Sequence, residues 1–497
     1  MVMADTRKRP LWKPSAADFQ RILGEQNPWL ADGSVPDTLA RKVERPLAME
    51  LWKRVLEDAP RRYQLILGPR RVGKTTCLYQ TVRHLLHEGI PRRRVWWLRL
   101  DHPLLLSIPL GEWVRDLLKG TNATNEAPLY LFLDELAYAS EWDLWLKTFY
   151  DEQWPVRIVG SSSSTAVLRD RRMESGVGRW EEQFMAPYLF LEFLDLIDQP
   201  IAVPEAETLA SCIDRCIDAD IDIGSLENAR RRFLFTGGFP ELLIETSQAD
   251  MDEASLLLES QRTLKNDAIE RAVYKDIPQA FSIDNPMLLE RLLYTLAGQI
   301  TGILSPTSLC RTLDGLSLPT FDRYVAYLER AFLIFRLQNY SGTEAARQKR
   351  GRKLYFVDAA VRNAALQRGV APLSDPVEMS QLYENLAASH LHVLAQHAQV
   401  RLYYWRDGQH EVDLVFDHPT EPLAFEIAAS TTHSQAGLLE FTRRFPRFAG
   451  KCYLVAPNAT SMRSLDSRDG IGSLPLDLFL LAVSQQAHNA MSARLGV

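Results

Sequence analysis

The chain has 497 residues, of which 46% are hydrophobic and 24% are charged. At roughly 150 residues per domain this length predicts about three domains, and the composition excludes a disordered, collagen-like or coiled-coil chain. The net charge of −6 gives no overall attraction to polyanions, so any nucleic-acid binding must come from a local basic patch. The 5 cysteines lack metal-ligand spacing, and no apolar run has the ~18 residues of a membrane span. We therefore expect a cytoplasmic protein without a structural zinc site.

The first 42 residues contain several prolines and no sustained periodicity, which predicts an extended N-terminal arm. From residue 43 onward, short apolar runs alternate with amphipathic helical segments. These runs are predicted strands at residues 63–67, 95–100, 129–133, 156–159 and 188–191. Strands that alternate with helices are typical of a parallel sheet covered on both faces, so residues 43–195 are predicted to form an α/β domain.

A glycine-containing loop lies between the first predicted strand and a predicted helix at residues 75–87. The loop has the spacing of a phosphate-binding loop and comprises Gly68, Pro69, Arg70, Arg71, Val72, Gly73, Lys74, Thr75 and Thr76. Backbone N–H groups of such a loop surround the β-phosphate, and the following helix adds its positive N-terminus. We expect Lys74 to reach the β- and γ-phosphates of ATP and the Thr75 hydroxyl to complete the shell of a Mg²⁺ ion.

Two carboxylates, Asp134 and Glu135, end the predicted strand at residues 129–133. An apolar run that ends in two acidic residues is a weak signal by itself, but behind a phosphate-binding loop it indicates the second nucleotide motif. We expect Asp134 to hold Mg²⁺ through water and Glu135 to polarise the attacking water.

Polar and basic residues follow the predicted strand at residues 156–159. Ser161 or Ser162 is expected to contact the γ-phosphate or the attacking water, with an ordinary serine-rich loop as the equal alternative. Phosphoryl transfer also needs positive charge. Arg179 is the preferred candidate from the arginine-rich segment that follows, and a solvated helix face is the alternative for these arginines.

The middle of the chain is predicted to be helical. Residues 196–285 are helical and acidic and are interrupted by a Gly-Gly-Phe-Pro sequence, which indicates a helical lid. Residues 286–357 are expected to contain three short helices and then two paired strands, a pattern typical of a winged helix. The predicted helices and strands lie at residues 287–299, 306–312, 320–331, 332–337 and 354–357.

The loop between those two strands is basic. Its predicted DNA-binding residues are Arg347, Lys349, Arg350, Arg352 and Lys353. Such a loop resembles the wing of a winged helix and would bind DNA phosphates, while a solvated hairpin tip is the alternative. Residues 358–497 are predicted to form a last α/β segment with a helix near residues 378–396. Its strands are predicted at residues 400–405, 411–416, 423–427 and 452–455.

The order of the motifs resembles prokaryotic AAA+ ATPases, similar to archaeal-type P-loop ATPases, that carry a C-terminal restriction-endonuclease-like domain of unknown function. The resemblance spans about residues 43–455. It rests on the segments Gly68–Thr76, Leu133–Glu135, Gly160–Ser162, Gly178–Arg179, Pro187–Leu194, Gly237–Glu241, Tyr383–Asn385, Tyr403–Arg406, Glu411–Asp413 and Phe425–Ile427. It implies a P-loop NTPase parallel sheet with a helical lid, a winged-helix unit and a restriction-endonuclease-like α/β domain.

The resemblance also implies roles for three acidic residues of the last segment. In restriction-endonuclease-like sites two carboxylates on neighbouring strands bind Mg²⁺, and a lysine orients water. Asp413 and Glu426 take the carboxylate places, and Glu384 is a third. The lysine position is Ala428, which can neither position water nor neutralise charge. We therefore expect that this domain does not cut DNA.

These observations predict an ATP-hydrolysing AAA+ type protein whose nucleotide state controls the winged-helix and nuclease-like module on DNA. One alternative is an ATP-dependent nuclease that uses Asp413 and Glu426. The other is an ATP-controlled switch that assembles with itself or with a partner protein and never processes DNA.

Overall fold

The structure, a computed structural model, describes residues 15–496 apart from 58–60, 164–177, 220, 243–251, 282, 284, 314 and 342–350. The contacts among these residues define two compact units. The first contains the described residues up to Gly68 together with Lys74–Met185, and the second contains Pro69–Gly73 and Ala186–Gly496. No helix formed by the described residues has both the length and the apolar character needed to cross a bilayer.

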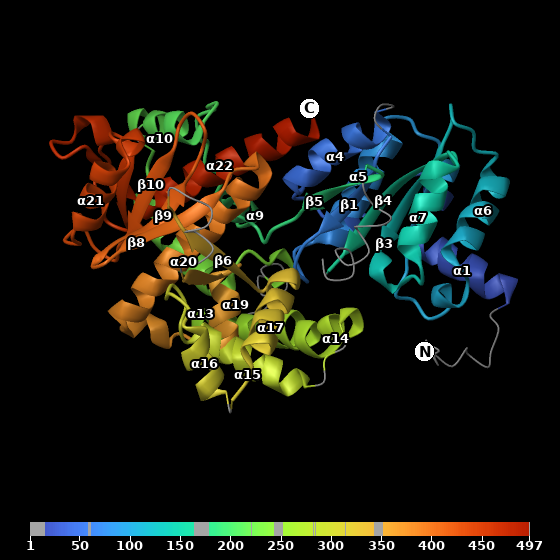
Figure 1. Ribbon diagram of the computed structural model, residues 1–497. Helices are drawn as coiled ribbons and strands as arrows, with labels where there is room; N and C mark the ends of the chain where they lie inside the picture. Colours follow the sequence, from blue (N-terminus) through green and yellow to red (C-terminus); the bar gives the residue numbers. More distant parts are fainter. Residues whose placement is uncertain are drawn as a thin grey trace. The chain divides into compact units, whose positions relative to one another are not determined.

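The first unit contains a five-stranded sheet in which every pairing is parallel (Figure 1). The strand order is β2-β3-β4-β1-β5. The strands are β1 (Tyr63–Leu67), β2 (Val95–Arg99), β3 (Leu129–Asp134), β4 (Val156–Ser162) and β5 (Trp180–Phe184). β1 and β3 are buried at every position, as expected for strands covered on both faces. The predicted parallel sheet is confirmed.

Helices cover this sheet and connect its strands. They include α1 (Ala16–Gln26), α2 (Trp29–Asp32), α3 (Asp37–Ala40), α4 (Pro46–Leu56), α5 (Lys74–His87), α6 (Leu110–Thr121) and α7 (Trp142–Asp151). The helix predicted after the phosphate-binding loop is therefore confirmed as α5.

The N-terminal segment is folded, and the prediction of an extended arm is wrong for its described part. Ser15 begins α1 with a capping box, in which the backbone N–H of Asp18 donates to the Ser15 hydroxyl. The following residues bind the outer strand of the sheet. The Asn27 side chain donates to Trp97 O at 2.9 Å and accepts from Trp97 N at 2.6 Å, and Trp29 Nε1 donates to Val95 O at 2.9 Å. Predicted arm residues 1–14 lie outside the described part.

The fifth strand of the sheet is not the one predicted at residues 188–191. That apolar run begins helix α9 (Phe190–Leu196), where Leu189 N donates to the Glu192 carboxylate at 2.9 Å. Phe190 to Leu194 are all buried, so the run has no polar face from which a helical period could be recognised. The true strand, β5, reads Trp-Glu-Glu-Gln-Phe and lies at the edge of the sheet, where polar residues are tolerated.

The second unit is built on a seven-stranded mixed sheet. The strand order is β12-β11-β10-β9-β8-β6-β7. The strands are β6 (Ile334–Asn339), β7 (Arg352–Phe356), β8 (Leu402–Asp407), β9 (His410–Phe416), β10 (Leu423–Ile427), β11 (Cys452–Ala456) and β12 (Ile471–Pro475). The predicted pairing of the two hairpin strands is confirmed, because β6 and β7 are antiparallel neighbours. β6 also pairs with β8, so the hairpin and the last α/β segment share one sheet.

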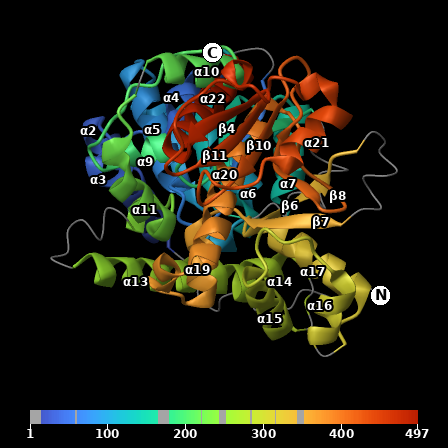
Figure 2. The ribbon, with the colours of Figure 1, turned by 90° about the vertical axis from the view of Figure 1, so that its left-hand side faces the viewer.

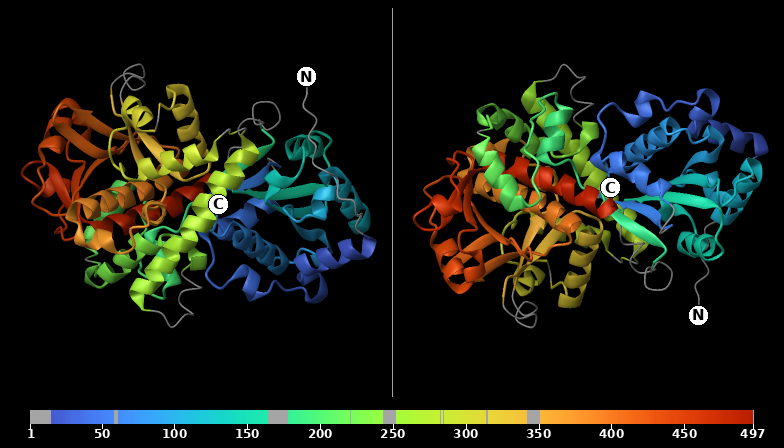
Figure 3. Two further views of the ribbon diagram at one scale, coloured as in Figure 1. Left: turned by 90° about the horizontal axis from the view of Figure 1, so that it is seen from below. Right: turned by 90° about the horizontal axis from the view of Figure 1, so that it is seen from above.

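Helices surround this second sheet. They include α9, α10 (Leu209–Asp218), α11 (Glu227–Thr236), α13 (Glu253–Leu264), α14 (Ile277–Ala280), α15 (Pro286–Ala297), α16 (Pro306–Thr312), α17 (Leu318–Arg330), α19 (Ala359–Leu366), α20 (Pro376–Ala398), α21 (Ala436–Arg444) and α22 (Leu476–Leu495). α13 continues into π-helical segments at Lys265–Glu270 and Ala272–Asp276. α19 packs beside α13 and α15 (Figure 2), and α22 packs along α20 (Figure 3).

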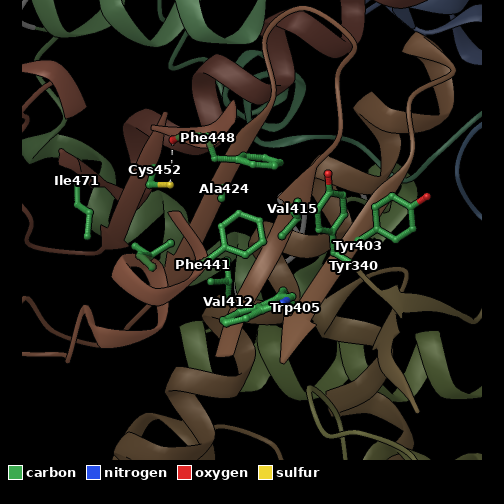
Figure 4. Close-up of a cluster of buried hydrophobic side chains, with 11 residues drawn as sticks. Tyr340, Tyr403, Trp405, Val412, Val415, Ala424, Phe441, Phe448, Cys452 and Ile471 are labelled. Atoms are coloured by element: carbon green, nitrogen blue, oxygen red, sulfur yellow. Dashed lines mark hydrogen bonds between the residues drawn. The ribbon is translucent and has the colours of Figure 1, made fainter. Parts of the chain in front are cut away.

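The core of the last α/β segment is aromatic. Figure 4 shows Tyr340, Tyr403 and Trp405 together with Phe441 and Phe448. The Tyr340 and Phe441 rings meet edge to face with centroids 5.8 Å apart, and those of Phe441 and Phe448 are 4.8 Å apart. This packing joins β6, β8 and α21 into one layer and holds the sheet that carries the acidic residues described below.

The Gly-Gly-Phe-Pro sequence has a structural role within the second unit. Gly237 has φ 71°, and a Cβ on Gly238 would lie 2.2 Å from Tyr188 O. The closeness of these two backbones allows Tyr188 N to donate to Gly238 O at 2.7 Å. Gly238 N donates to the buried Asp358 carboxylate at 2.8 Å. Only glycine fits both positions without displacing the neighbouring chain.

Candidate functional site

The phosphate-binding loop lies at the carboxyl end of β1 and leads into α5. A Cβ on Gly68 would lie 2.0 Å from Met185 O, so this position requires glycine. Arg71 and Gly73 adopt positive φ values of 68° and 90°, which bend the chain back toward the helix. Lys74 Nζ donates to Gly68 O at 2.9 Å, across the loop. The backbone thus has the compact curvature that the motif predicts.

Three side chains meet beside the loop, at the carboxyl edge of the sheet. Thr75 Oγ1 donates to Asp134 Oδ2 at 2.7 Å, and Ser161 Oγ donates to the other oxygen of the same carboxylate. Asp134 is buried, and this burial raises the pKa of its carboxyl, while the hydrogen bonds from Ser161 and Thr75 act in the opposite direction. The contributing elements are β3, β4 and the first turn of α5, as expected for a ligand site in a parallel sheet.

Glu135 follows Asp134 and is fixed through its backbone. It has φ 55°, in the left-handed region, and its N–H donates to Ser161 Oγ at 3.1 Å. Its side-chain Oε2 accepts from Ser163 Oγ at 3.4 Å. Of the two serines that the sequence offered, Ser161 is the one that joins both acidic residues, while Ser162 is buried on the same strand. Their roles toward nucleotide remain predictions.

Arg179, the candidate source of positive charge for phosphoryl transfer, does not lie beside the loop of its own chain, and its catalytic role stays a prediction. It precedes β5, whose first residue, Trp180, pairs with Tyr63 at the start of β1. The phosphate-binding loop follows the carboxyl end of β1. Arg179 therefore lies at the amino ends of the strands, on the opposite side of the sheet from the loop. Its guanidinium binds Asp151 at the end of α7, with Nε–Oδ1 and Nη2–Oδ2 distances of 2.8 and 3.0 Å.

The side chains of the loop arginines belong, by their contacts, to the second unit. Arg70 donates to both oxygens of Asp276, at 2.6 and 2.5 Å. Arg71 pairs with Asp267 at 2.5 Å and with Glu241. We therefore expect both residues to contact phosphate through their backbone N–H groups and not through their side chains.

A second cluster of charged residues lies in the second unit and centres on Lys353 of β7. Lys353 Nζ lies 2.7 Å from Glu384 Oε1, 2.6 Å from Glu411 Oε1 and 2.7 Å from Asp413 Oδ1. Its side chain is 2% exposed. Lys353 was predicted to bind DNA, and this prediction is wrong because the buried ammonium cannot reach a phosphate. Of the other predicted wing residues, Arg352 is half-buried, and Arg347, Lys349 and Arg350 lie outside the described residues.

The geometry of the cluster follows from strand alternation. Lys353 and Tyr355 are two residues apart on β7 and lie on one face, and Tyr355 Oη donates to Glu384 Oε1 at 2.7 Å. Burial, and then the charge of Asp413, raise the pKa of Glu384 to about 8. The neighbouring Asn385 fixes α20 to the strand, since its Oδ1 accepts from Phe356 N at 2.8 Å and its Nδ2 donates to Phe356 O at 3.1 Å.

Glu426 on β10 is held differently. Its Oε1 lies 3.1 Å from His433 Nε2, and its buried Oε2 has no hydrogen-bond partner among the described residues. Burial and the nearby Asp413 raise the pKa of Glu426 to about 8, and the hydrogen bond to Glu426 raises the pKa of His433. Lys451, which precedes β11, is half-buried and donates to Thr420 O at 3.4 Å, so its ammonium is directed to a backbone carbonyl.

The metal site that the resemblance implied at Glu384, Asp413 and Glu426 is not formed. Within the described part of the chain, no three His, Cys, Asp or Glu residues are grouped so that they could hold a metal ion. The physical reason is the Lys353 ammonium, which sits between Glu384 and Asp413. Sequence reasoning missed this partner, although polar residues two positions apart, at Lys353 with Tyr355 and at Glu411 with Asp413, indicated that each pair shares a face.

Three protein families match separate parts of the chain. Residues 60–194 match an AAA domain, residues 227–371 match a domain of unknown function (DUF8612), and residues 379–478 match another domain of unknown function (DUF4143). The first unit therefore carries an AAA-type ATPase domain, in agreement with the phosphate-binding loop and the Asp134 cluster. The restriction-endonuclease-like character of the last segment remains a prediction.

Curated relatives are themselves uncharacterised. A protein of Methanocaldococcus jannaschii is 25% identical over 372 residues, which cover 73% of this chain and 75% of the relative. A Haemophilus influenzae protein is 21% identical over 319 residues, which cover 63% of this chain and 72% of the relative.

Solved structures show weak similarity. The Aeropyrum pernix Orc1 protein in complex with DNA has a TM-score of 0.31 at 15% identity and covers 69% of this chain and 97% of its own. AMPPCP-bound DnaA from Aquifex aeolicus has a TM-score of 0.25 at 13% identity and covers 58% and 98%. Similarities at this level carry no functional argument.

Proposed function

We propose that the AAA domain binds ATP with Mg²⁺ and hydrolyses the nucleotide. The observation that carries this proposal is the meeting of Thr75, Asp134 and Ser161 directly beside a phosphate-binding loop. Thr75 Oγ1 and Asp134 Oδ2 lie 2.7 Å apart, and the same carboxylate is bound by Ser161. A glycine turn that binds nothing would not need a buried carboxylate at its side.

The residues present fit ATP with Mg²⁺. Magnesium prefers oxygen ligands, and a threonine hydroxyl with an aspartate carboxylate is such a donor set. Thr75 and Asp134 would hold the ion, which would neutralise negative charge on the phosphates when bound. Lys74 stands at the first position of α5, so its ammonium and the N-terminal end of the helix both favour a negatively charged ligand.

Within this site Glu135 is the candidate general base that activates the attacking water. Its N–H is fixed by Ser161 at 3.1 Å, which sets the direction in which its side chain leaves the strand end. Ser161 thereby positions two carboxylates with different tasks, since it also donates to Asp134. Asp134, beside the Thr75 hydroxyl, would hold the ion, and Glu135 would accept a proton from the attacking water.

Two substitutions test this proposal. Lys74→Ala is expected to abolish ATP binding or hydrolysis, and Glu135→Gln is expected to keep binding while hydrolysis slows. Lys119→Ala, which removes an exposed lysine of the same unit, is the matched control. Nucleotide binding is measured by fluorescence titration and turnover by phosphate release. Unchanged turnover in the Glu135→Gln protein would contradict the assignment of Glu135 as the base.

Action on DNA is the finer part of the proposal. The supporting observation is the chain order α15, α16, α17 followed by the β6–β7 hairpin, the order expected for a winged helix with a basic loop between its strands. If that loop contacts phosphates, reversing Arg350 and Arg352 to Glu weakens DNA binding across sequences alike and flattens its salt dependence by about one unit per lost contact.

The control for this test reverses two exposed charges elsewhere, Lys119→Glu with Arg262→Glu. DNA affinity is measured by mobility shift with ATP, with ADP and without nucleotide. Unchanged affinity and salt slope in the Arg350/Arg352 variant would exclude the wing as the contact. Turnover that DNA stimulates favours a DNA-dependent ATPase, whereas slow turnover at any DNA concentration favours an assembly switch.

A further inference from the structure

We propose that Lys353 is a built-in cation of the second unit, and that its ammonium takes the central place that a divalent metal would take in a nuclease-like carboxylate cluster. The cluster Glu384, Glu411 and Asp413 is therefore closed without a metal. This inference concerns the second unit alone and is independent of ATP hydrolysis in the first.

The first argument is the hydrogen-bonding capacity of the ammonium. A lysine ammonium has three N–H donors and no acceptor. Lys353 Nζ has a carboxylate oxygen of each cluster member at 2.6 to 2.7 Å. The contacts to Glu411 and Asp413 are hydrogen bonds of charge-assisted length, and the contact to Glu384 is an ion pair. The ammonium thus stands where the carboxylates converge, and a second cation beside it would be repelled by its charge.

The second argument is burial. The Lys353 side chain is 2% exposed, so a metal could enter only if the ammonium left its carboxylates while still enclosed by protein. Separating a buried charge from its partners costs several kcal/mol or more. The strand also cannot withdraw easily, because β7 pairs with β6 on one side while Thr301 N and Leu304 N donate to Leu354 O and Arg352 O, each at 2.9 Å.

The third argument comes from the remaining carboxylate. In a metal-dependent site Glu426 would join Asp413 on the ion. Here the Glu426 carboxylate pairs with His433 at 3.1 Å, while Asp413 Oδ2 accepts from Ile427 N at 2.9 Å. The two carboxylates are thus held by different partners. Ala428 cannot supply the missing ammonium, so the lysine of this centre comes from β7 instead.

The proposal is tested first on the native, nucleotide-free chain. Mn²⁺ is titrated and followed by calorimetry and by electron paramagnetic resonance of the free ion, with Asp413→Asn as the comparison. We expect the two proteins to bind Mn²⁺ alike. A Mn²⁺ site that is present in the native chain and lost in Asp413→Asn would overturn the proposal, and this measurement does not depend on any Lys353 variant.

The second test removes the ammonium but keeps the aliphatic stem. Lys353→Met is expected to lower the thermal midpoint of the second unit and to gain a Mn²⁺ site that raises it again. The double variant Lys353→Met/Asp413→Asn should lose this site, and Lys451→Met, which removes a half-buried lysine of the same unit, should gain none. A folded Lys353→Met protein that takes up no Mn²⁺ also overturns the proposal. If Lys353→Met does not fold, the native titration decides.

Discussion

Both units contain a lysine and buried carboxylates, yet the two centres use them in opposite ways. In the AAA domain, Lys74 binds the carbonyl oxygen of Gly68, and the Asp134 carboxylate is held by uncharged hydroxyls. In the second unit, Lys353 binds three carboxylates directly. The carboxylates around Lys353 offset its charge directly, whereas the hydrogen bonds to Asp134 come from uncharged groups. We expect this difference in pairing, more than the inventory of residues, to decide which centre accepts a charged ligand.

The largest expected effect comes from breaking the closed centre, which is the cluster of carboxylates around Lys353. Asp413→Ala leaves the Lys353 ammonium buried with one partner fewer, which is expected to cost about 3–5 kcal/mol of stability. Urea unfolding of the second unit measures it. The double variant Lys353→Met/Asp413→Leu, which removes both charges, should be less destabilised than Asp413→Ala. A loss below about 1 kcal/mol in Asp413→Ala would mean that the pair is not buried in solution.

A smaller effect is expected at the open centre, which is the group of side chains around Asp134 in the AAA domain. Ser161→Ala removes the hydrogen bonds to Asp134 and to the N–H of Glu135. Hydrogen bonds to charged groups contribute about 1.5–3 kcal/mol, so turnover should fall roughly tenfold to a hundredfold while ATP still binds. Phosphate release and nucleotide titration separate the two effects, with the exposed Ser107→Ala as control. If Ser161→Ala and the native protein had the same turnover, Ser161 would have no positioning role.

Asp358 is a buried carboxylate with no cationic partner among the described residues, and it sharpens the comparison. It accepts from the backbone N–H groups of Gly238 and Ala360, and burial raises its pKa from 3.8 to about 6. The folded state therefore binds the proton more tightly than the unfolded state, so stability falls as pH rises from about 4 to about 6, by about 2–3 kcal/mol.

This pH dependence is measured as the difference between native protein and Asp358→Asn. The amide cannot ionise, so the part of the stability loss that belongs to Asp358 should disappear in the variant. Asp322→Asn, an exposed aspartate on α17, is the control. Identical pH profiles for native protein and Asp358→Asn would contradict the assignment.

The smallest effect is expected at Arg179. Because this residue lies at the edge of the sheet opposite the phosphate-binding loop and pairs with Asp151, Arg179→Ala should leave turnover unchanged in dilute solution. Assembly provides the sharper test. If a neighbouring copy instead supplies Arg179, Arg179→Ala loses turnover at high protein concentration, and mixing it with Glu135→Gln restores turnover. No recovery, with Arg179→Ala active alone, leaves the residue its structural role.

The open centre could be predicted from the sequence because its residues are local. Gly68 to Thr76 form one loop, and Asp134 and Ser161 each end an apolar strand, so parallel pairing alone brings them together. The closed centre could not be predicted in this way. Lys353 stands 31 residues before Glu384 and 60 before Asp413, and its neighbours in the sequence are basic. A basic segment indicates an exposed surface, and only the pleat of β7 turns this one lysine inward.

The helix that begins at residues 188–191 and the strand β5 were missed for different reasons. The run at residues 188–191 has no polar face, and its helical start depends on a backbone hydrogen bond to Glu192. β5 carries two glutamates and could not be recognised as a strand from hydrophobicity. The hairpin strands β6 and β7 were predicted correctly, but their addition to the sheet of the last segment depends on the pairing of Gln338 and Asn339 with β8, which leaves no local sequence signal.

The side chains of Asn27 and Trp29 have a consequence for how short this protein can be made. They form hydrogen bonds with the N–H of Trp97 and with the carbonyls of Val95 and Trp97 on β2, an edge strand of the first sheet. A truncation that starts after residue 42 would leave these groups open to any passing extended chain, a template for intermolecular strand addition. We therefore expect this segment, which reads as dispensable in the sequence, to protect the sheet of the AAA domain from aggregation.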